Sequence, residues 1–166
     1  MPFVLVVGLD RVTKWVIRAT LWDPPRQRII VPSWLELTPV ENRGIAFGML
    51  QTVGPLLAIV AVVVLGAIAL RNWRQVLGAP FLVRVALGLI AGGAIGNVID
   101  RAQFGYVTDF IRVPRIELFQ VFNVSDASIV VGTALLAIAT LWADARRPRS
   151  GPTATPKVEP TSAQQL

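Results

Sequence analysis

The sequence predicts a mainly α-helical membrane protein, with four transmembrane helices and a small β-cradle on the extracytoplasmic side. Three long apolar blocks carry this prediction, since a helix needs about 20 apolar residues to cross the hydrocarbon core of a bilayer. Hydrophobic residues make up 54% of the 166 residues, and the mean hydropathy is +0.60. This composition is too apolar for an ordinary soluble domain of this length. We therefore expect residues 1–145 to form one membrane domain.

The N-terminal segment is the least regular of the four predicted helices. Residues 2–22 are apolar but carry Asp10, Arg11, Lys14 and Arg18. These charges follow the apolar residues, whereas a cleaved signal peptide has its basic residues first. Asp10 and Lys14 are four residues apart, so on a helix they can pair and offset part of the cost of burial. The segment is therefore predicted to be a membrane helix.

The other three helices are predicted at residues 53–70, 79–99 and 127–143. The first and the last of these blocks carry no charge. In the middle block, Pro80 suits a helix start, and Arg84 lies close enough to the end to extend its charge to the membrane surface. Each block is long enough to span the membrane.

Three glycines in the third helix, Gly88, Gly92 and Gly96, recur at every fourth residue. This spacing places them on one face, where they allow another helix to approach closely. A dinucleotide-binding loop is not expected, because no strand–turn–helix pattern surrounds them. The glycines predict a packing seam.

Charges in the connecting segments predict the orientation, because lysine and arginine near membrane ends stay in the cytoplasm. Residues 71–84 carry three arginines and no acid, and the chain from residue 144 carries four basic residues against two acidic ones. Residues 100–126 carry three arginines against four acids, and residues 19–51 are balanced. We expect both termini in the cytoplasm and these last two segments facing outward.

The outward segments contain two candidate strand regions. The stretches "QRIIVPSWLELTPV" (27–40) and "FGYVTDFIRV" (104–113) mix β-branched and aromatic residues with polar ones, which suits short strands at the membrane surface. By contrast, residues 146–166 are rich in proline and polar residues and lack periodicity. They are predicted to form a disordered cytoplasmic tail.

The composition excludes most catalytic machinery. The chain has no cysteine and no histidine, so it has no disulfide, thiol nucleophile, Ser-His-Asp triad or histidine-bound metal, and we expect no metal or cofactor. Carboxylates with shifted pKa values, or one of two lysines, remain as proton carriers. The net charge of +6 does not predict nucleic-acid binding, because the arginines adjoin apolar blocks and form no basic arm.

Polar residues gather at the outward membrane surface. Several have a structural explanation: Asp100 could pair with Arg101, and Asn123 or Ser125 could cap the last helix, whose dipole Asp126 would then favour. Asp109 lies in an apolar strand and has no obvious structural purpose. The residues that the predicted topology delivers to this surface are Asn42, Asn97, Asp100, Arg101, Asp109, Asn123 and Asp126.

Two carboxylates brought together at a lipid boundary behave as a pair. Like charges at close range do not both ionise easily, so one proton tends to be shared and one pKa rises. Such a pair can deprotonate a water with one carboxylate and protonate a substrate carbonyl with the other. This is the chemistry of an aspartic protease, which needs no histidine, cysteine or metal.

With these residues in place, the sequence resembles the lipoprotein signal peptidases, or signal peptidase II, a family of bacterial membrane aspartic endopeptidases. The resemblance covers about residues 3–143 and depends on five blocks that occur in the order and near the spacings of the family. The blocks are "DRVTK" (10–14), "NRGIAFG" (42–48), "GNVIDR" (96–101), "VTDFI" (107–111) and "FNVSD" (122–126).

The resemblance implies an enzyme of the bacterial cytoplasmic membrane whose active site faces outward. It would cleave a diacylglyceryl-modified prolipoprotein immediately before the lipidated cysteine, with membrane lipid around it, and we expect a monomer. Asp109 and Asp126 match the catalytic aspartates of the family, and Asp10 and Lys14 match a block with a structural role. Positions that line or support the site are Asn42, Gly44, Asn97, Asp100, Arg101 and Asn123.

The sequence departs from the family at a few positions. The family commonly has glutamine at Arg11, valine at Thr108 and alanine at Ser125. The family also has a longer first helix, and the short segment before Asp10 leaves open a misassigned start or a helix that enters the membrane at a shallow depth.

Two other functions remain open. One is a small proton-coupled transporter that uses interfacial carboxylates, and the other is an assembly protein without chemistry. Apart from Asp10, the acids lie at helix ends and away from the bilayer midplane, which argues against transport.

Overall fold

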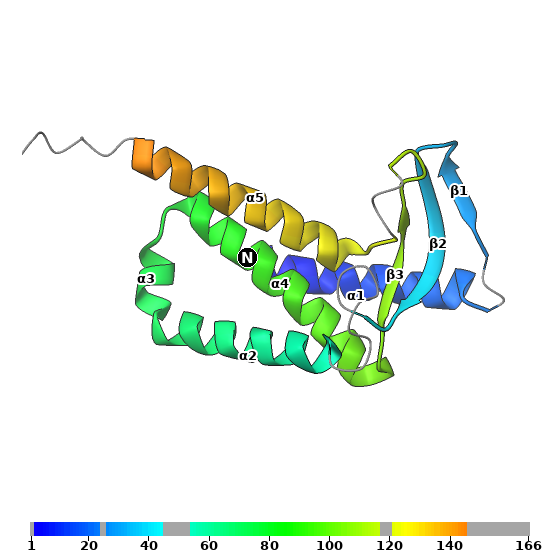
Figure 1. The fold of residues 1–166 in the computed structure, drawn as a ribbon, viewed down its shortest axis with the longest axis horizontal. Coiled ribbons are helices and arrows are strands. Elements are labelled where there is room, and N and C mark those ends of the chain that lie inside the picture. The colour runs from blue at the N-terminus through cyan, green and yellow to red at the C-terminus, as the bar shows by residue number, and fades with distance from the viewer. Residues whose placement is uncertain (1, 24–25, 45–53, 117–120, 146–166) are drawn as a thin grey trace, which may run out of the picture.

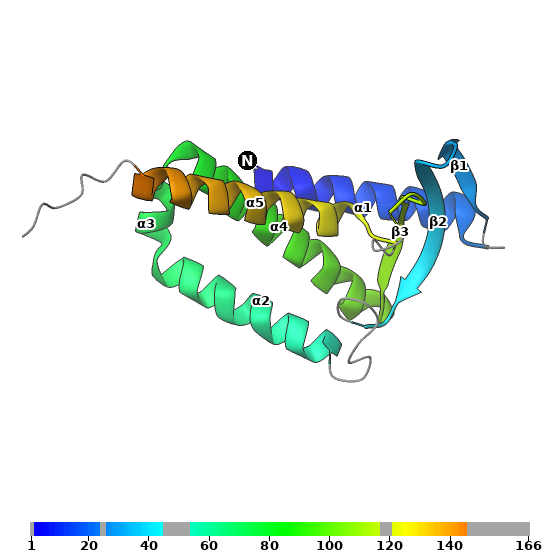
Figure 2. The ribbon, with the colours of Figure 1, turned by 45° about the horizontal axis from the view of Figure 1, so that its top comes forward.

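The computed structural model describes residues 2–23, 26–44, 54–116 and 121–145 (Figure 1). Long helices run beside one another, and a three-stranded sheet lies across one end of them (Figures 1 and 2). The predicted tail at residues 146–166 lies outside the described residues. The elements are α1 (Pro2–Leu21), β1 (Arg28–Val31), β2 (Leu35–Asn42), α2 (Gly54–Arg71), α3 (Trp73–Gly78), α4 (Phe81–Phe104), β3 (Val107–Arg112) and α5 (Val124–Ala145).

The four long helices correspond to the four predicted ones. In the described part of the chain, α4 and residues 124–143 of α5 are long and apolar enough to cross a membrane. That α1 and α2 also cross it stays a prediction. Helix α4 is longer than expected and ends at Phe104. The following Gly105 has a left-handed φ of 75°, and its N–H donates to the Arg101 carbonyl over 3.0 Å.

Helix α4 packs between α1 and α5 through the predicted glycine seam. A Cβ atom at Gly88 would lie 2.6 Å from Pro2 Cγ, and one at Gly92 would lie 2.9 Å from Val6 Cβ. A Cβ atom at Gly96 would collide with Ser125 Oγ of α5. The first two glycines therefore allow α1 to approach α4 closely, and Gly96 does the same for the start of α5. The packing prediction is confirmed.

The sheet is antiparallel in the order β1-β2-β3, which confirms strands in both predicted regions. Val40 of β2 pairs with Asp109 of β3, and a bridge joins Ile111 to Phe122 just before α5. The sheet packs on the end of α1, because Phe110 lies in a buried cluster with Ile17 and Leu21. Strand β3 is thereby fixed beside the start of α5.

Candidate active site

Asp109 lies at the middle of β3, and only 2% of its surface is exposed. Its Oδ1 accepts a hydrogen bond of 2.6 Å from Asn123 Nδ2, and its Oδ2 accepts one of 2.9 Å from Asn42 Nδ2. Asn42 ends β2 and Asn123 precedes α5. The end of β2 and the segment before α5 therefore hold this carboxyl group of β3.

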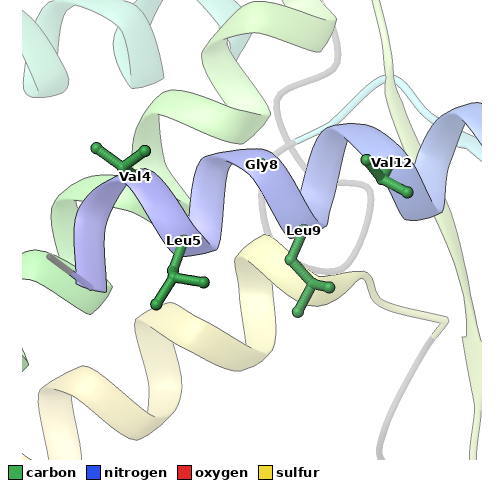
Figure 3. A pocket seen from close by; sticks show the side chains of 5 residues that line it. All are labelled: Val4, Leu5, Gly8, Leu9 and Val12. Carbon is green, nitrogen blue, oxygen red and sulfur yellow. The ribbon is translucent and has the colours of Figure 1, made fainter.

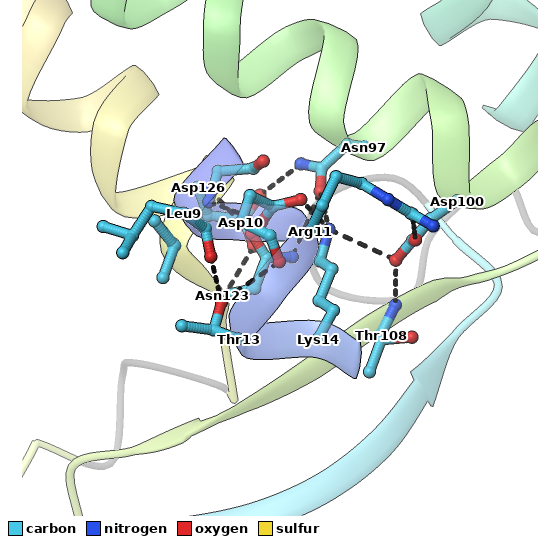
Figure 4. A network of polar contacts seen from close by, with 12 residues as sticks. Leu9, Asp10, Arg11, Thr13, Lys14, Asn97, Asp100, Thr108, Asn123 and Asp126 are labelled. Carbon is cyan, nitrogen blue, oxygen red and sulfur yellow. Dashed lines mark hydrogen bonds and ion pairs between the residues drawn. The ribbon is translucent and has the colours of Figure 1, made fainter. Parts of the chain in front are cut away.

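Asp126 lies in the first turn of α5 (Figure 4). Its Oδ2 accepts the backbone N–H of Asn123 over 3.2 Å, and its own N–H donates to Asn123 Oδ1 over 2.9 Å. These reciprocal bonds form a capping box, so the structural explanation for Asn123 and Asp126 is correct. The cap uses only one carboxylate oxygen, since Oδ1 accepts a 2.7 Å hydrogen bond from Asn97 Nδ2.

The two aspartates are connected through the side-chain amides of Asn123 and Asn97. Asn123 Nδ2 donates to Asp109 Oδ1 and also to Asn97 Oδ1 over 3.1 Å. Asn97 Oδ1 also accepts a 3.1 Å hydrogen bond from Lys14 Nζ. The Asp126 backbone N–H and the Lys14 ammonium group can only donate hydrogen bonds. The amide oxygen of Asn123 therefore faces the Asp126 N–H, and the amide oxygen of Asn97 faces Lys14. The amide N–H groups then face the carboxylates.

The environment of Asp109 favours its protonated form. Burial, followed by the negative charge of Asp126, raises the pKa of the Asp109 carboxyl to about 7, against the ordinary value of 3.8. The hydrogen bonds from Asn42 and Asn123 oppose this rise, as does the charge of Lys14. A carboxyl group with such a pKa can gain and lose a proton near neutral pH.

Asp10 and Asp100 have quite different surroundings (Figure 4). Lys14 Nζ lies 2.9 Å from Asp10 Oδ2 and 3.2 Å from Asp100 Oδ2, and all three side chains are fully buried. Arg11 and Arg18 each contact Asp100 Oδ1 at 2.8 Å. The predicted pair of Asp10 and Lys14 is confirmed, and Asp100 joins the same cluster of charges.

The prediction that Asp100 could pair with Arg101 is wrong. No ion pair joins them in the segments that the structure describes, since successive helical residues point in different directions. Arg101 Nη2 donates instead to the Gly44 carbonyl over 3.1 Å, and the Gly44 N–H donates to Asn42 Oδ1 over 3.1 Å. Arg101 therefore fixes the segment that orients Asn42 toward Asp109.

The sequence interpretation missed three residues of this site. Arg18 donates to Thr108 Oγ1 over 3.0 Å as well as contacting Asp100, and the Thr108 N–H donates to Asp100 Oδ2 over 3.0 Å. Arg11 and Arg18 could have been found by their spacing, because a helix places them on the same face as Lys14. Nothing in the sequence indicates the role of the Thr108 hydroxyl.

An apolar groove lies on the outer face of α1, separate from the aspartates (Figure 3). No carboxylate lines it, and its lining side chains are apolar. Among the described residues, no group of three or more histidine, cysteine, aspartate or glutamate side chains could hold a metal ion. The groove is lined by Val4, Leu5, Gly8, Leu9 and Val12.

Comparison with known proteins links this chain to a family. The lipoprotein signal peptidase of Syntrophomonas wolfei is 42% identical over 149 residues, which are 89% of this chain and 95% of that protein. The lipoprotein signal peptidase of Methylobacterium sp. is 40% identical over 141 residues, which are 83% and 85% of the two chains. A bacterial membrane enzyme solved by the in meso method at 2.3 Å superposes with a TM-score of 0.77, at 28% identity and 92% coverage of both chains. Residues 2–142 match the family model described as "Signal peptidase (SPase) II", and the chain therefore belongs to the signal peptidase II family.

Proposed function

We propose that this protein is an intramembrane aspartic endopeptidase. It removes the signal peptide from diacylglyceryl-modified prolipoproteins by cleaving just before the lipidated cysteine. Its relatives are lipoprotein signal peptidases, which supports the substrate class. Asp109 and Asp126 are the catalytic pair, supported by the network of Asn42, Asn97 and Asn123.

The observation that carries this proposal is the contrast among the buried aspartates. Asp10 and Asp100 each form an ion pair with at least one cation. In the described part of the chain, Asp109 and Asp126 contact amide and backbone N–H groups and form no ion pair. Only this second pair is free to exchange protons with a substrate.

The geometry favours different roles for the two carboxyl groups. Asp126 accepts a backbone N–H at the start of α5, where the helix dipole stabilises a negative charge. We assign it as the base. Asp109 is more deeply buried on a strand, and its pKa of about 7 leaves it largely protonated below neutral pH. We assign it as the acid.

The reaction then follows from these protonation states. Asp126 takes a proton from water as the water oxygen attacks the carbonyl carbon, and Asp109 gives its proton to the carbonyl oxygen, which forms a gem-diol. Asp109 next recovers a proton from one hydroxyl of the gem-diol, and Asp126 gives its proton to the departing amine. The carbon–nitrogen bond breaks, and both carboxyl groups return to their starting states.

The depth of the site suits a lipidated substrate. The aspartates lie where α4 ends and α5 begins, and both helices are long enough to cross a membrane. Acyl chains could stay in lipid while the peptide bond meets water and acid at this boundary. We place this boundary at the outer face of the cytoplasmic membrane, with both termini in the cytoplasm, because of the charges in the connecting segments.

Nothing in the described residues favours the transporter alternative. Asp10, the acid farthest from a helix end, is fully buried against Lys14 and is not placed to relay a proton. The relatives are peptidases.

The dependence on lipidation tests this function. Purified protein in detergent should cleave a diacylglyceryl-modified precursor and leave the same precursor without the lipid uncut, because the acyl chains hold the scissile bond at the boundary. Product formation can be followed by gel mobility, and a variant of the exposed Asp23, Asp23→Asn, should match the unaltered protein. Efficient cleavage of the unlipidated precursor would refute the interfacial part of the proposal.

A further inference from the structure

The end of the sheet away from the aspartates exposes large apolar side chains. They lie on β1, in the turn between β1 and β2, and in the turn that follows β3. Their exposed fractions range from 42% for Ile116 to 60% for Ile29. We name this surface the sheet tip, and it comprises Arg28, Ile29, Ile30, Val31, Trp34, Arg115 and Ile116.

Hydrogen bonds within the turns and a contact between them fix the conformation of the sheet tip. The Trp34 N–H donates to the Val31 carbonyl over 3.0 Å, and Ser33 between them has a left-handed φ of 60°. The Ile116 N–H closes the second turn on Val113 over 3.0 Å. The Arg115 guanidinium lies 4.6 Å from the centre of the Trp34 ring and joins the two turns.

The sheet tip lies at the membrane boundary that the proposed function requires. Strand β3 begins three residues after α4 ends, so the sheet stands at the same end of the helices as the aspartates. Figure 1 shows the turn between β1 and β2 projecting to one side of the helices, past the start of α5. In a membrane, this projection would extend over the lipid that surrounds the bundle.

The charge of the sheet tip points to an anionic partner. Arg28 and Arg115 are exposed, and neither forms an ion pair with any described residue. Arginine binds phosphate through paired N–H groups, and tryptophan beside arginine is typical of surfaces at the headgroup level of a membrane. Arginines close to an anionic membrane surface are attracted to it.

We propose that the sheet tip binds the phosphate headgroups of anionic phospholipids in the outer leaflet. Arg28 and Arg115 contact the phosphates, and Trp34 with the neighbouring isoleucines lies at the boundary between headgroups and acyl chains. This contact holds the sheet, and with it Asp109 on β3, at a fixed height over the membrane. The inference relies on the proposed membrane placement and adds a lipid site that is distinct from the substrate site.

A single labelled cysteine can test this contact, because the chain has no cysteine of its own. Val31→Cys carries an environment-sensitive fluorophore in full-length protein, in nanodiscs of phosphatidylcholine alone or of phosphatidylcholine with phosphatidylglycerol. Lipids with a nitroxide at the headgroup quench a probe that lies near them. We expect quenching about twofold stronger with phosphatidylglycerol. The change Arg28→Gln with Arg115→Gln should abolish this difference.

The matched control is Arg74→Gln, because Arg74 also lies over a tryptophan, Trp73, at 5.6 Å, but on α3 at the other end of the helices. It should leave the difference intact. Equal quenching in the two lipids would overturn the proposal, and so would quenching that arises only when a precursor is added, which would identify a peptide site. If the probe stays unquenched while the same nanodiscs cleave lipidated precursor, the sheet tip proposal fails and the proposed function stands.

Discussion

At the scale of single residues, the partners of each carboxyl group determine what it can do. Asp10 and Asp100 are bound in ion pairs in the cluster around Lys14. A buried carboxyl group bonded only to amides has no such constraint, and Asp109 accordingly has a pKa of about 7. The sequence places Asp100 and Asp109 near one surface, but it does not tell which cations each acid contacts.

The pKa of Asp109 predicts a pH limit for catalysis. The acid must be protonated, so kcat/KM should fall by about tenfold for each pH unit above about pH 7, as Asp109 loses its proton. A pH profile with purified protein and a lipidated precursor measures this limit. A flat profile up to pH 9 would show that Asp109 does not supply the proton, and the integrity of the fold at each pH can be followed by tryptophan fluorescence.

Lys14 joins the buried side chains of Asp10, Asp100 and Asn97, next to the catalytic aspartates. Lys14→Met removes the ammonium group that contacts Asp10, Asp100 and Asn97, and leaves the buried Asp10 carboxyl group without its ion-pair partner. We expect a loss of about 3–5 kcal/mol in the free energy of unfolding. Thermal unfolding in detergent measures this loss. Arg84→Met, which removes a cation elsewhere on the membrane helices, is the control, and equal effects of the two changes would contradict the assigned role.

At the scale of elements, the site depends on the close approach of α1 and α5 to α4. The glycine spacing in α4 predicts this approach, and the structure confirms it at Gly88, Gly92 and Gly96. The strands could also be predicted, from β-branched and aromatic residues in the outward segments. The contacts of Arg11 and Arg18 with Asp100 could not, because they join residues 89 and 82 positions apart and depend on how α1 rotates against α4.

Gly96→Ala tests the packing that brings these elements together. The added Cβ would lie 2.7 Å from Asp10 Oδ2 and would collide with Ser125 Oγ, so α5 must shift. Overpacking of this kind costs about 1–3 kcal/mol, and we expect a lower temperature of unfolding. Gly66→Ala in α2 is the matched control, since a Cβ there meets no atom within 4 Å. If both variants unfold at the same temperature, the seam is not tightly packed.

At the scale of the whole molecule, the helices and the sheet each contribute different residues to the site. Helix α4 delivers Asn97 and Arg101 to one end of the bundle, and α5 starts there with Asn123 and Asp126. The sheet returns the chain to the same place and adds Asp109. Apolar patterning predicts the helices and their outward ends, and five sequence blocks predict the family. The protonation of the aspartates and the connections of their amides follow only from the assembled fold.

The most direct test of this account is precursor cleavage by the separate variants Asp109→Asn and Asp126→Asn. The amide retains the size of each side chain but does not exchange protons as the carboxyl group does, so each change should reduce kcat by about 10³-fold or more. Each variant should still insert into membranes and accumulate, as checked by membrane fractionation. Processing of a diacylglyceryl-modified prolipoprotein by purified protein gives the rate. Loss of cleavage in both variants is the predicted result, and an unchanged rate in either one would contradict the catalytic pair.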